Sequence, residues 1–214
     1  MNINLLDPTL HYLLSSLEEC GWHDMASYDM AAIADRCNCD FFNGASRGCF
    51  MYKDWDFVIK VPLYTNKNIS TDYCKVEVET YQKICKEYPL CAPLFAEIRY
   101  LGEYGEMKIY AQEKISQSWF DFRNTHEIEA DTICGERLDY SKKNPIFQNS
   151  FHEIMGSRLS FDYYFLILKV LGKAVFDSFT KWALDTAQTD LHDSNVGLTA
   201  DNVPKIFDYA GFNG

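Results

Sequence analysis

An apolar stretch at positions 161–184 is the sequence feature that most constrains the fold of this chain. Charged residues recur along it at every fourth position: Lys169, Lys173, Asp177 and Lys181. In a helix this spacing gathers the charges into one stripe, whereas aromatic and aliphatic residues cover the remaining surface. A helix that crosses a bilayer would not carry such a stripe. We therefore expect a long helix over 161–185, largely buried at the centre of a helical lobe.

Strand-like and helix-like segments are separated along the chain rather than alternating. Before the long helix, the pattern predicts a helix entered at Asp7-Pro8, a helix over 28–36, strands at 40–43, 49–52 and 56–61, a helix over 71–87, and strands at 94–101 and 107–113 joined by a loop at 102–105. After Ile115 it predicts a short helix around Trp119, an irregular polar segment at 129–144, a helix near 146–156, and a tail of loop and short strand at 189–214. Segregation of this kind predicts an α+β fold with two unequal lobes.

Composition and charge limit the classes of function open to the chain. Of its 214 residues, 47% are apolar and 15% aromatic, which is enough for a sizeable core, and the formal net charge is −11. A chain with this negative charge repels phosphate backbones and anionic lipid headgroups. We therefore expect neither nucleic acid nor a membrane as a partner. A local basic pocket could nevertheless hold an anionic ligand such as a nucleotide.

The cysteines and the N-terminus bear on where the protein works. Eight cysteines are scattered along the chain without a C-x-x-C pair, and Cys37 and Cys39 have no partner pair at the spacing of zinc ligands. Reduced thiols are therefore favoured over disulfides or a metal site. The N-terminus lacks the basic and apolar regions of a signal peptide. Together these features predict a cytoplasmic protein.

Three polar residues in the C-terminal tail point to a specific chemistry. Asp190 and Asn195 lie five positions apart on the loop that follows the long helix, and Asp208 follows a short apolar strand. Phosphoryl transfer needs one carboxylate that orients the attacking hydroxyl. It also needs an amide oxygen and a second carboxylate that hold magnesium against a triphosphate. A loop followed by a strand can bring three such side chains to one point.

This tail resembles the catalytic loop and metal-binding motif of the protein-kinase-like superfamily, which includes protein kinases and the aminoglycoside and choline phosphotransferases. The run DLHDSN at 190–195 resembles its D-x-x-x-x-N loop. The resemblance implies a two-lobed fold with a small antiparallel-sheet N-lobe and a reduced helical C-lobe. It also implies ATP and Mg²⁺ as cofactors, Asp190 as catalytic base, and Asn195 and Asp208 as magnesium ligands. His192 stands where the small-molecule phosphotransferases usually carry histidine, and either a phosphate contact or a structural bond to backbone fits it.

A lysine-bearing strand and the helix after it extend the resemblance to the N-terminal half. The run VIK at 58–60 resembles the V-A-I-K strand, whose lysine pairs with the α- and β-phosphates. This implies that Lys60 contacts phosphate and that a glutamate of the following helix orients it. Glu77 is favoured because the residues three, four and seven positions on share its helix face. Glu79 is the alternative.

Two further segments complete the predicted nucleotide site. The run 44–49 stands where the glycine-rich loop of the family lies, and glycines let backbone amides approach phosphates. The resemblance implies phosphate contacts from Gly44, Ser46 and Gly48, and contacts to the adenine edge from the backbone of Glu113 and Ile115. Arg47, at the tip of the predicted loop, is expected to be exposed and solvated rather than bound to phosphate.

Departures from the family pattern leave two functions open. Gln188-Thr189 replaces the usual His-Arg, Gly211 follows Asp208 by three positions rather than two, and no activation segment is recognisable. We expect an ATP- and magnesium-dependent phosphotransferase that acts on a hydroxyl of a protein Ser or Thr or of a small molecule. The alternative is a catalytically weak pseudokinase that binds nucleotide or protein. The predicted division is a helical extension over 1–38, an N-lobe over 39–115 and a truncated C-lobe over 116–214.

Overall fold

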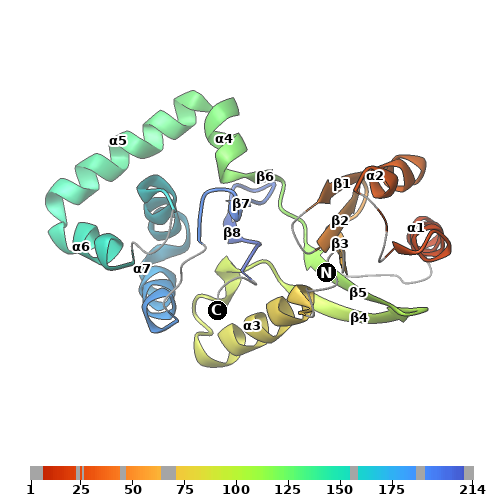
Figure 1. Ribbon diagram of the computed structural model, residues 1–214. Coiled ribbons are helices and arrows are strands. Elements are labelled where there is room, and N and C mark those ends of the chain that lie inside the picture. Colours follow the sequence, from red (N-terminus) through yellow and green to blue (C-terminus); the bar gives the residue numbers. More distant parts are fainter. Residues whose placement is uncertain are drawn as a thin grey trace. The chain divides into compact units, whose positions relative to one another are not determined.

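A computed structural model describes residues 7–22, 25, 27–43, 47–63, 71–154, 159–186 and 191–209. The fold is α+β, as the sequence predicts. The chain forms two compact units (Figure 1): the first contains Met1–Glu79 and Glu97–Lys114, and the second contains Thr80–Ala96 and Ile115–Gly214. The segment Thr80–Ala96, which the sequence assigned to the N-lobe, thus belongs to the second unit.

A five-stranded antiparallel sheet forms the centre of the first unit, with the strand order β1-β2-β3-β5-β4. Its strands are β1 (Cys39–Asn43), β2 (Arg47–Tyr52), β3 (Phe57–Pro62), β4 (Ile98–Tyr104) and β5 (Met107–Glu113). On the central strand β3, Lys60 lies opposite Cys49 of β2 and Tyr110 of β5. Because directly opposite residues of an antiparallel pair point to the same face, these three side chains share one face of the sheet.

Helices α1 (Pro8–Glu19) and α2 (Ser27–Arg36) pack on the core of the first unit. As predicted, the Asp7 carboxylate begins α1 by accepting hydrogen bonds from the backbone N–H of Thr9 and of Leu10, at 2.8 and 3.0 Å. The leucines of α1 that recur at helical spacing are all buried: Leu10, Leu13, Leu14 and Leu17. They join Phe50 and Ile59 of the sheet in one hydrophobic core. The helices expected before residue 38 are therefore confirmed.

Helix α3 (Tyr73–Glu87) begins in the first unit and ends in the second. The backbone of Asp72 accepts a hydrogen bond from Val76 N–H, and its side chain accepts one from Lys75 N–H at 3.0 Å. Asp72 therefore caps the helix start. Cys74, Glu77 and Ile84 are fully buried along this helix.

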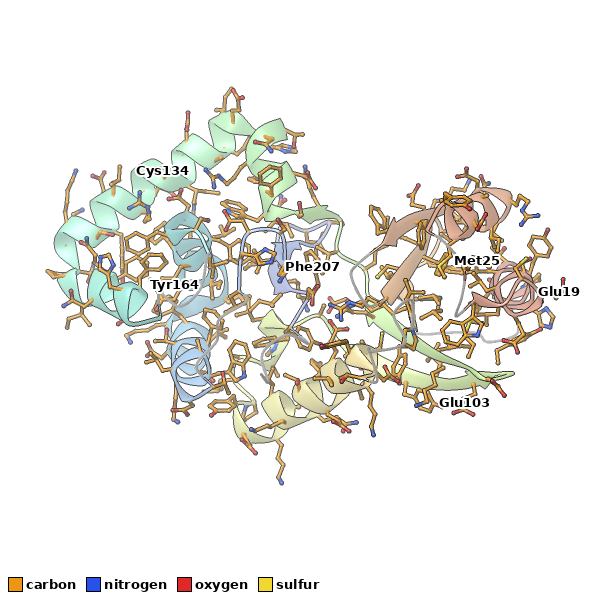
Figure 2. The ribbon with its side chains drawn as sticks, viewed as in Figure 1. Glu19, Met25, Glu103, Cys134, Tyr164 and Phe207 are labelled. Carbon is orange, nitrogen blue, oxygen red and sulfur yellow. The ribbon has the colours of Figure 1, made fainter. Side chains whose placement is uncertain are left out.

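Four helices make up most of the second unit: α4 (Trp119–Thr125), α5 (Glu127–Lys143), α6 (Pro145–Ile154) and α7 (Phe161–Asp185). The charged stripe of α7 is exposed, as predicted, and all of its aromatic residues except Phe161 are buried. Tyr164, labelled in Figure 2, lies in an aromatic cluster with Phe147, Phe176 and Phe179. Gly172 interrupts the helical geometry of α7 with a φ of 82°. Among the described residues, no helix has the length and apolar character that crossing a bilayer requires.

A small three-stranded sheet completes the second unit, in the order β6-β7-β8. Its strands are β6 (Gln117–Ser118), β7 (Val196–Leu198) and β8 (Pro204–Ile206). The Tyr163 hydroxyl of α7 contacts the carbonyl oxygens of Gly197 and Lys205, at 2.9 and 2.8 Å. The segment that follows α3 joins the same sheet, because the Ala96 N–H donates to the Ile206 carbonyl at 2.8 Å. The long helix therefore holds the β7–β8 hairpin in place from one side.

Three local predictions were wrong. Positions 129–144 are not irregular but lie almost entirely in α5, where only Ile133 is buried. This helix has no clear apolar face, but acidic residues in its first turn and lysines in its last complement the helix dipole. Strand β4 begins at Ile98 rather than near 94, since the short 3₁₀ helix η2 (Ala92–Leu94) occupies the earlier positions. The hairpin turn lies after Tyr104 rather than at 102–105, because β4 continues to Tyr104, past a register shift between Tyr100 and Gly102.

Candidate functional site

A buried ion pair joins the sheet of the first unit to α3. The Lys60 Nζ donates to the Glu77 Oε2 at 2.9 Å, and Glu77 is 0% exposed. Glu79 points elsewhere, because its side chain is 61% exposed and pairs with Lys75 at 3.7 Å. Of the two glutamates that the sequence left open, Glu77 is therefore the partner of Lys60. A buried, hydrogen-bonded pair of this kind fixes the lysine head group in one orientation.

Arg47 is buried in the same cluster, contrary to the sequence prediction of a solvated side chain. It is 8% exposed, and its guanidinium lies 3.6 Å from the Glu77 Oε1. The reason is the start of β2, which begins at Arg47 rather than at 49. Arg47 and Cys49 are two positions apart on this strand, so both point to the face that carries Lys60. The apolar pattern of this strand begins at 49, so it carried no signal that could have revealed Arg47.

A second polar contact links the start of α3 to the sheet. The Tyr110 hydroxyl donates to the Asp72 Oδ2 at 2.6 Å, and the Lys108 Nζ lies 3.7 Å from the same oxygen. Burial, followed by the bond to Asp72, raises the pKa of the Tyr110 phenol well above its ordinary value. The phenol therefore stays protonated and donates its hydrogen at neutral pH. Burial also raises the pKa of the Cys74 thiol, in the first turn of the helix.

The predicted glycine-rich loop is described only in part. Gly44 and Ser46 lie outside the described residues. Gly48 lies within β2, opposite Val61, rather than in a turn. A Cβ at position 48 would stand 3.3 Å from the rings of Phe41 and Phe50, so glycine fits the packing of this face of the sheet. Its predicted contact with phosphate stays a prediction.

The residues of the predicted hinge end the first unit and begin the second. The Glu113 N–H donates to the Glu97 carbonyl at 2.8 Å, and the Lys114 N–H donates to the Asp56 carbonyl at 3.1 Å. The predicted contact of the Glu113 backbone with the adenine edge stays a prediction. Ile115 is the first residue of the second unit, where its side chain packs close to Gly197.

The end of the predicted catalytic loop is held by backbone and side-chain bonds. Asp190 lies outside the described residues. The His192 Nδ1 accepts from the Ser194 N–H at 3.2 Å, which matches the backbone-bonded alternative for this histidine. The Asp193 Oδ1 accepts from the backbone N–H of Ser160 at 2.7 Å, and its Oδ2 pairs with Arg123 at 3.2 Å. Asp193 thus fastens the loop to the start of α7 and to α4, a role that the sequence did not predict.

The backbones of the two predicted magnesium ligands are bonded to each other at the end of the β7–β8 hairpin. The backbone oxygen of Asn195 accepts from the N–H of Phe207 at 3.0 Å and of Asp208 at 3.4 Å. Phe207, labelled in Figure 2, directly follows β8, and Asn195 directly precedes β7. The carboxamide and the carboxylate are thereby carried on neighbouring pieces of backbone. Both side chains offer oxygen, the ligand atom that magnesium prefers, and their role as magnesium ligands stays a prediction.

Other kinds of metal site are not seen in the described part of the chain. A metal site built from His, Cys, Asp and Glu needs at least three such side chains close together, and the described residues contain no such group. Cys37 and Cys39 are buried, and burial raises the pKa of Cys39 to about 12, with Cys37 adding to the effect. All eight cysteines are described, and none forms a disulfide.

Comparisons with protein-family models, with curated proteins and with solved structures gave no match to this chain. The kinase-like interpretation therefore depends on the residues and contacts described above.

Proposed function

We propose that this protein is an ATP- and magnesium-dependent phosphotransferase that moves the γ-phosphoryl group to a hydroxyl acceptor, and that its fold is the two-lobed kinase-like one. The observation that carries the proposal is the buried Lys60–Glu77 pair, at 2.9 Å. Burying two charges in a protein interior is costly, and a hydrophobic pair of similar volume is often at least as stable. A pair whose task is to present an ammonium group to phosphate explains why the charges are retained.

The proposed roles follow from the chemistry of each side chain. Lys60, oriented by Glu77, binds the nucleotide phosphates as a compact positive charge. Asp190 orients the acceptor hydroxyl and takes its proton. Asn195 and Asp208 hold Mg²⁺, which neutralises charge on the phosphates when it is bound.

An ATP-transfer assay tests the proposal. Purified protein is incubated with γ-labelled ATP and magnesium, together with mixed protein and small-hydroxyl acceptors, and the products are identified by mass. We expect a labelled acceptor or labelled protein, and we expect Asp190→Asn to abolish transfer while nucleotide binding persists. Asp201→Asn is the control, because this exposed side chain lies in the turn between β7 and β8. Equal transfer by Asp190→Asn and the parent would show that Asp190 is not the base.

Nucleotide binding is measured separately from turnover. A ligand at a hundred times its dissociation constant stabilises the folded state by about 2.7 kcal/mol, which shifts the melting temperature. A shift with MgATP in the absence of transfer to any acceptor would favour the pseudokinase alternative. No shift and no transfer would refute the phosphotransferase and the nucleotide-binding form of the alternative, and would leave only a protein-binding module.

A further inference from the structure

The first turns of α3 are attached to the sheet mainly by polar contacts. Over positions 73–79, only Cys74 and Glu77 are fully buried, so apolar packing contributes little to holding this part of the helix. The two shortest of these contacts are the Lys60–Glu77 pair at 2.9 Å and the Tyr110–Asp72 hydrogen bond at 2.6 Å; Arg47 and Lys108 lie farther from the same carboxylates, at 3.6 and 3.7 Å. The position of Glu77 therefore depends on a small number of side-chain bonds.

The two contacts use one cross-strand pair of the sheet. Lys60 on β3 and Tyr110 on β5 are directly opposite each other, so both side chains leave the same face of the sheet side by side. Lys60 reaches Glu77, and Tyr110 reaches Asp72 at the start of the helix. Two attachment points about 7.5 Å apart along the helix axis fix its direction as well as its distance from the sheet.

Asp72 serves the helix and the sheet at the same time. Its Oδ1 accepts from the backbone N–H of Lys75 and so caps α3, while its Oδ2 accepts from the Tyr110 hydroxyl. The second oxygen also faces the Lys108 ammonium at 3.7 Å. Hydrogen bonds to an ionised carboxylate are about twice as strong as neutral ones. A single carboxylate thus transmits the position of β5 to the first turn of α3.

We propose that Tyr110 and Asp72 are positioning residues that hold Glu77 against Lys60. The inference rests on the proposed function for its effect on turnover, whereas its effect on α3 can be measured without any activity. Loss of the Tyr110 hydroxyl removes the hydrogen bond that ties Asp72 to the sheet and leaves only the longer, half-exposed Lys108 contact at that carboxylate. The helix start then separates from the sheet more often, and Glu77 spends more time away from its position beside Lys60.

Cysteine labelling tests the attachment directly. Cys74 is fully buried in the first turn of α3, and Cys39 is buried in the core of the same unit. Alkylation of each thiol under native conditions is followed over time by mass spectrometry of peptides. We expect Tyr110→Phe to label Cys74 about tenfold faster, the factor that corresponds to losing one charge-assisted hydrogen bond. The Cys39 rate should stay unchanged.

Tyr100→Phe is the matched control. Tyr100 lies opposite Tyr110 on β4, but its ring is exposed and its hydroxyl bonds to Glu103 at 3.2 Å rather than to α3. Equal labelling of Cys74 in Tyr110→Phe and Tyr100→Phe overturns the proposal. A parallel rise at Cys74 and Cys39 also overturns it, because it reveals general loosening of the unit rather than release of the helix start.

Turnover tests the second half of the proposal. A displacement of a catalytic group by on the order of 1 Å lowers rates strongly, so we expect kcat for phosphoryl transfer to fall about tenfold in Tyr110→Phe and to stay unchanged in Tyr100→Phe. Faster Cys74 labelling with an unchanged kcat would show that the bond holds α3 without positioning Glu77. If the parent protein transfers no phosphate, the proposed function fails, and the labelling result still decides whether Tyr110 holds the helix.

Discussion

Replacing Glu77 by glutamine keeps the size of the side chain but removes a carboxylate charge that faces both Lys60 and Arg47. The side chain is 0% exposed, and the two cations lie 2.9 and 3.6 Å from its oxygens. At an effective dielectric constant of about 20, Coulomb's law gives about 6 and about 5 kcal/mol for these two attractions. The cost of desolvating the charges offsets much of this sum.

The net loss is therefore smaller than the gross attraction. Removing one partner of a buried pair typically costs about 3–5 kcal/mol, because the remaining charges stay buried. Glutamine still accepts a hydrogen bond from Lys60, so we expect the lower end, about 3 kcal/mol. With a urea m-value of about 2 kcal/mol/M, the unfolding midpoint falls by about 1.5 M.

Glu79→Gln is the matched control, because it makes the same chemical change two positions along the same helix. The Glu79–Lys75 pair is exposed, and exposed pairs contribute at most about 1 kcal/mol. Urea unfolding followed by tryptophan fluorescence and circular dichroism should separate the midpoints of the two variants by at least about 1 M. Indistinguishable midpoints would refute the reasoning, since a buried Glu77 charge would then contribute no more than a solvated one.

Three further predictions concern other parts of the fold. Gly197→Ala should destabilise the protein by more than about 2 kcal/mol in urea unfolding, because the added methyl group would collide with the Gln117 carbonyl. In the control Gly135→Ala, in α5, the added methyl group meets no atom within 4 Å, so this variant should be as stable as the parent or more stable. Similar losses of stability in both variants would contradict this prediction. Gln112 is 2% exposed, and its Nε2 has no hydrogen-bond partner among the described residues. Gln112→Met removes this unsatisfied donor, so the urea midpoint should stay unchanged or rise. A large fall in the midpoint would show that the Gln112 side chain makes a stabilising hydrogen bond. Burial raises the pKa of Cys39 from 9.0 to about 12, so the thiol of the unfolded chain ionises at a lower pH than that of the folded protein. The free energy of unfolding should therefore fall between these pH values, by up to about 1.4 kcal/mol per pH unit. Cys39→Ala should flatten this dependence on pH, and an unchanged slope would show that other groups cause it.

Local patterns predicted the features that depend on helical or strand spacing. The choice of Glu77 over Glu79 came from the face that a helix presents, and the structure pairs Glu77 with Lys60. The charged stripe of the long helix and the leucine face of α1 followed from the same reasoning. These features depend on residues a few positions apart, which the sequence places without knowledge of the fold.

Features that depend on strand register could not be predicted in this way. Arg47 joins the ion cluster because β2 begins two residues earlier than its apolar pattern indicates. The bond between Tyr110 and Asp72 requires Lys60 and Tyr110 to be opposite, and nothing in the separate strands specifies that pairing. Helix α5 was missed because it buries only Ile133 and so lacks the periodic apolar face by which helices are recognised.

The two halves of the predicted site arise from segments that fold by different rules. Lys60 meets Glu77 because a central strand and a helix pack face to face, whereas Asn195 meets the backbone of Asp208 because a short hairpin closes. Either arrangement could have failed without affecting the other, since no residue is common to both. A chance resemblance in one segment gives no reason for the other to occur. That both occur, at residues chosen for one reaction, is the main physical reason to test phosphoryl transfer before other activities.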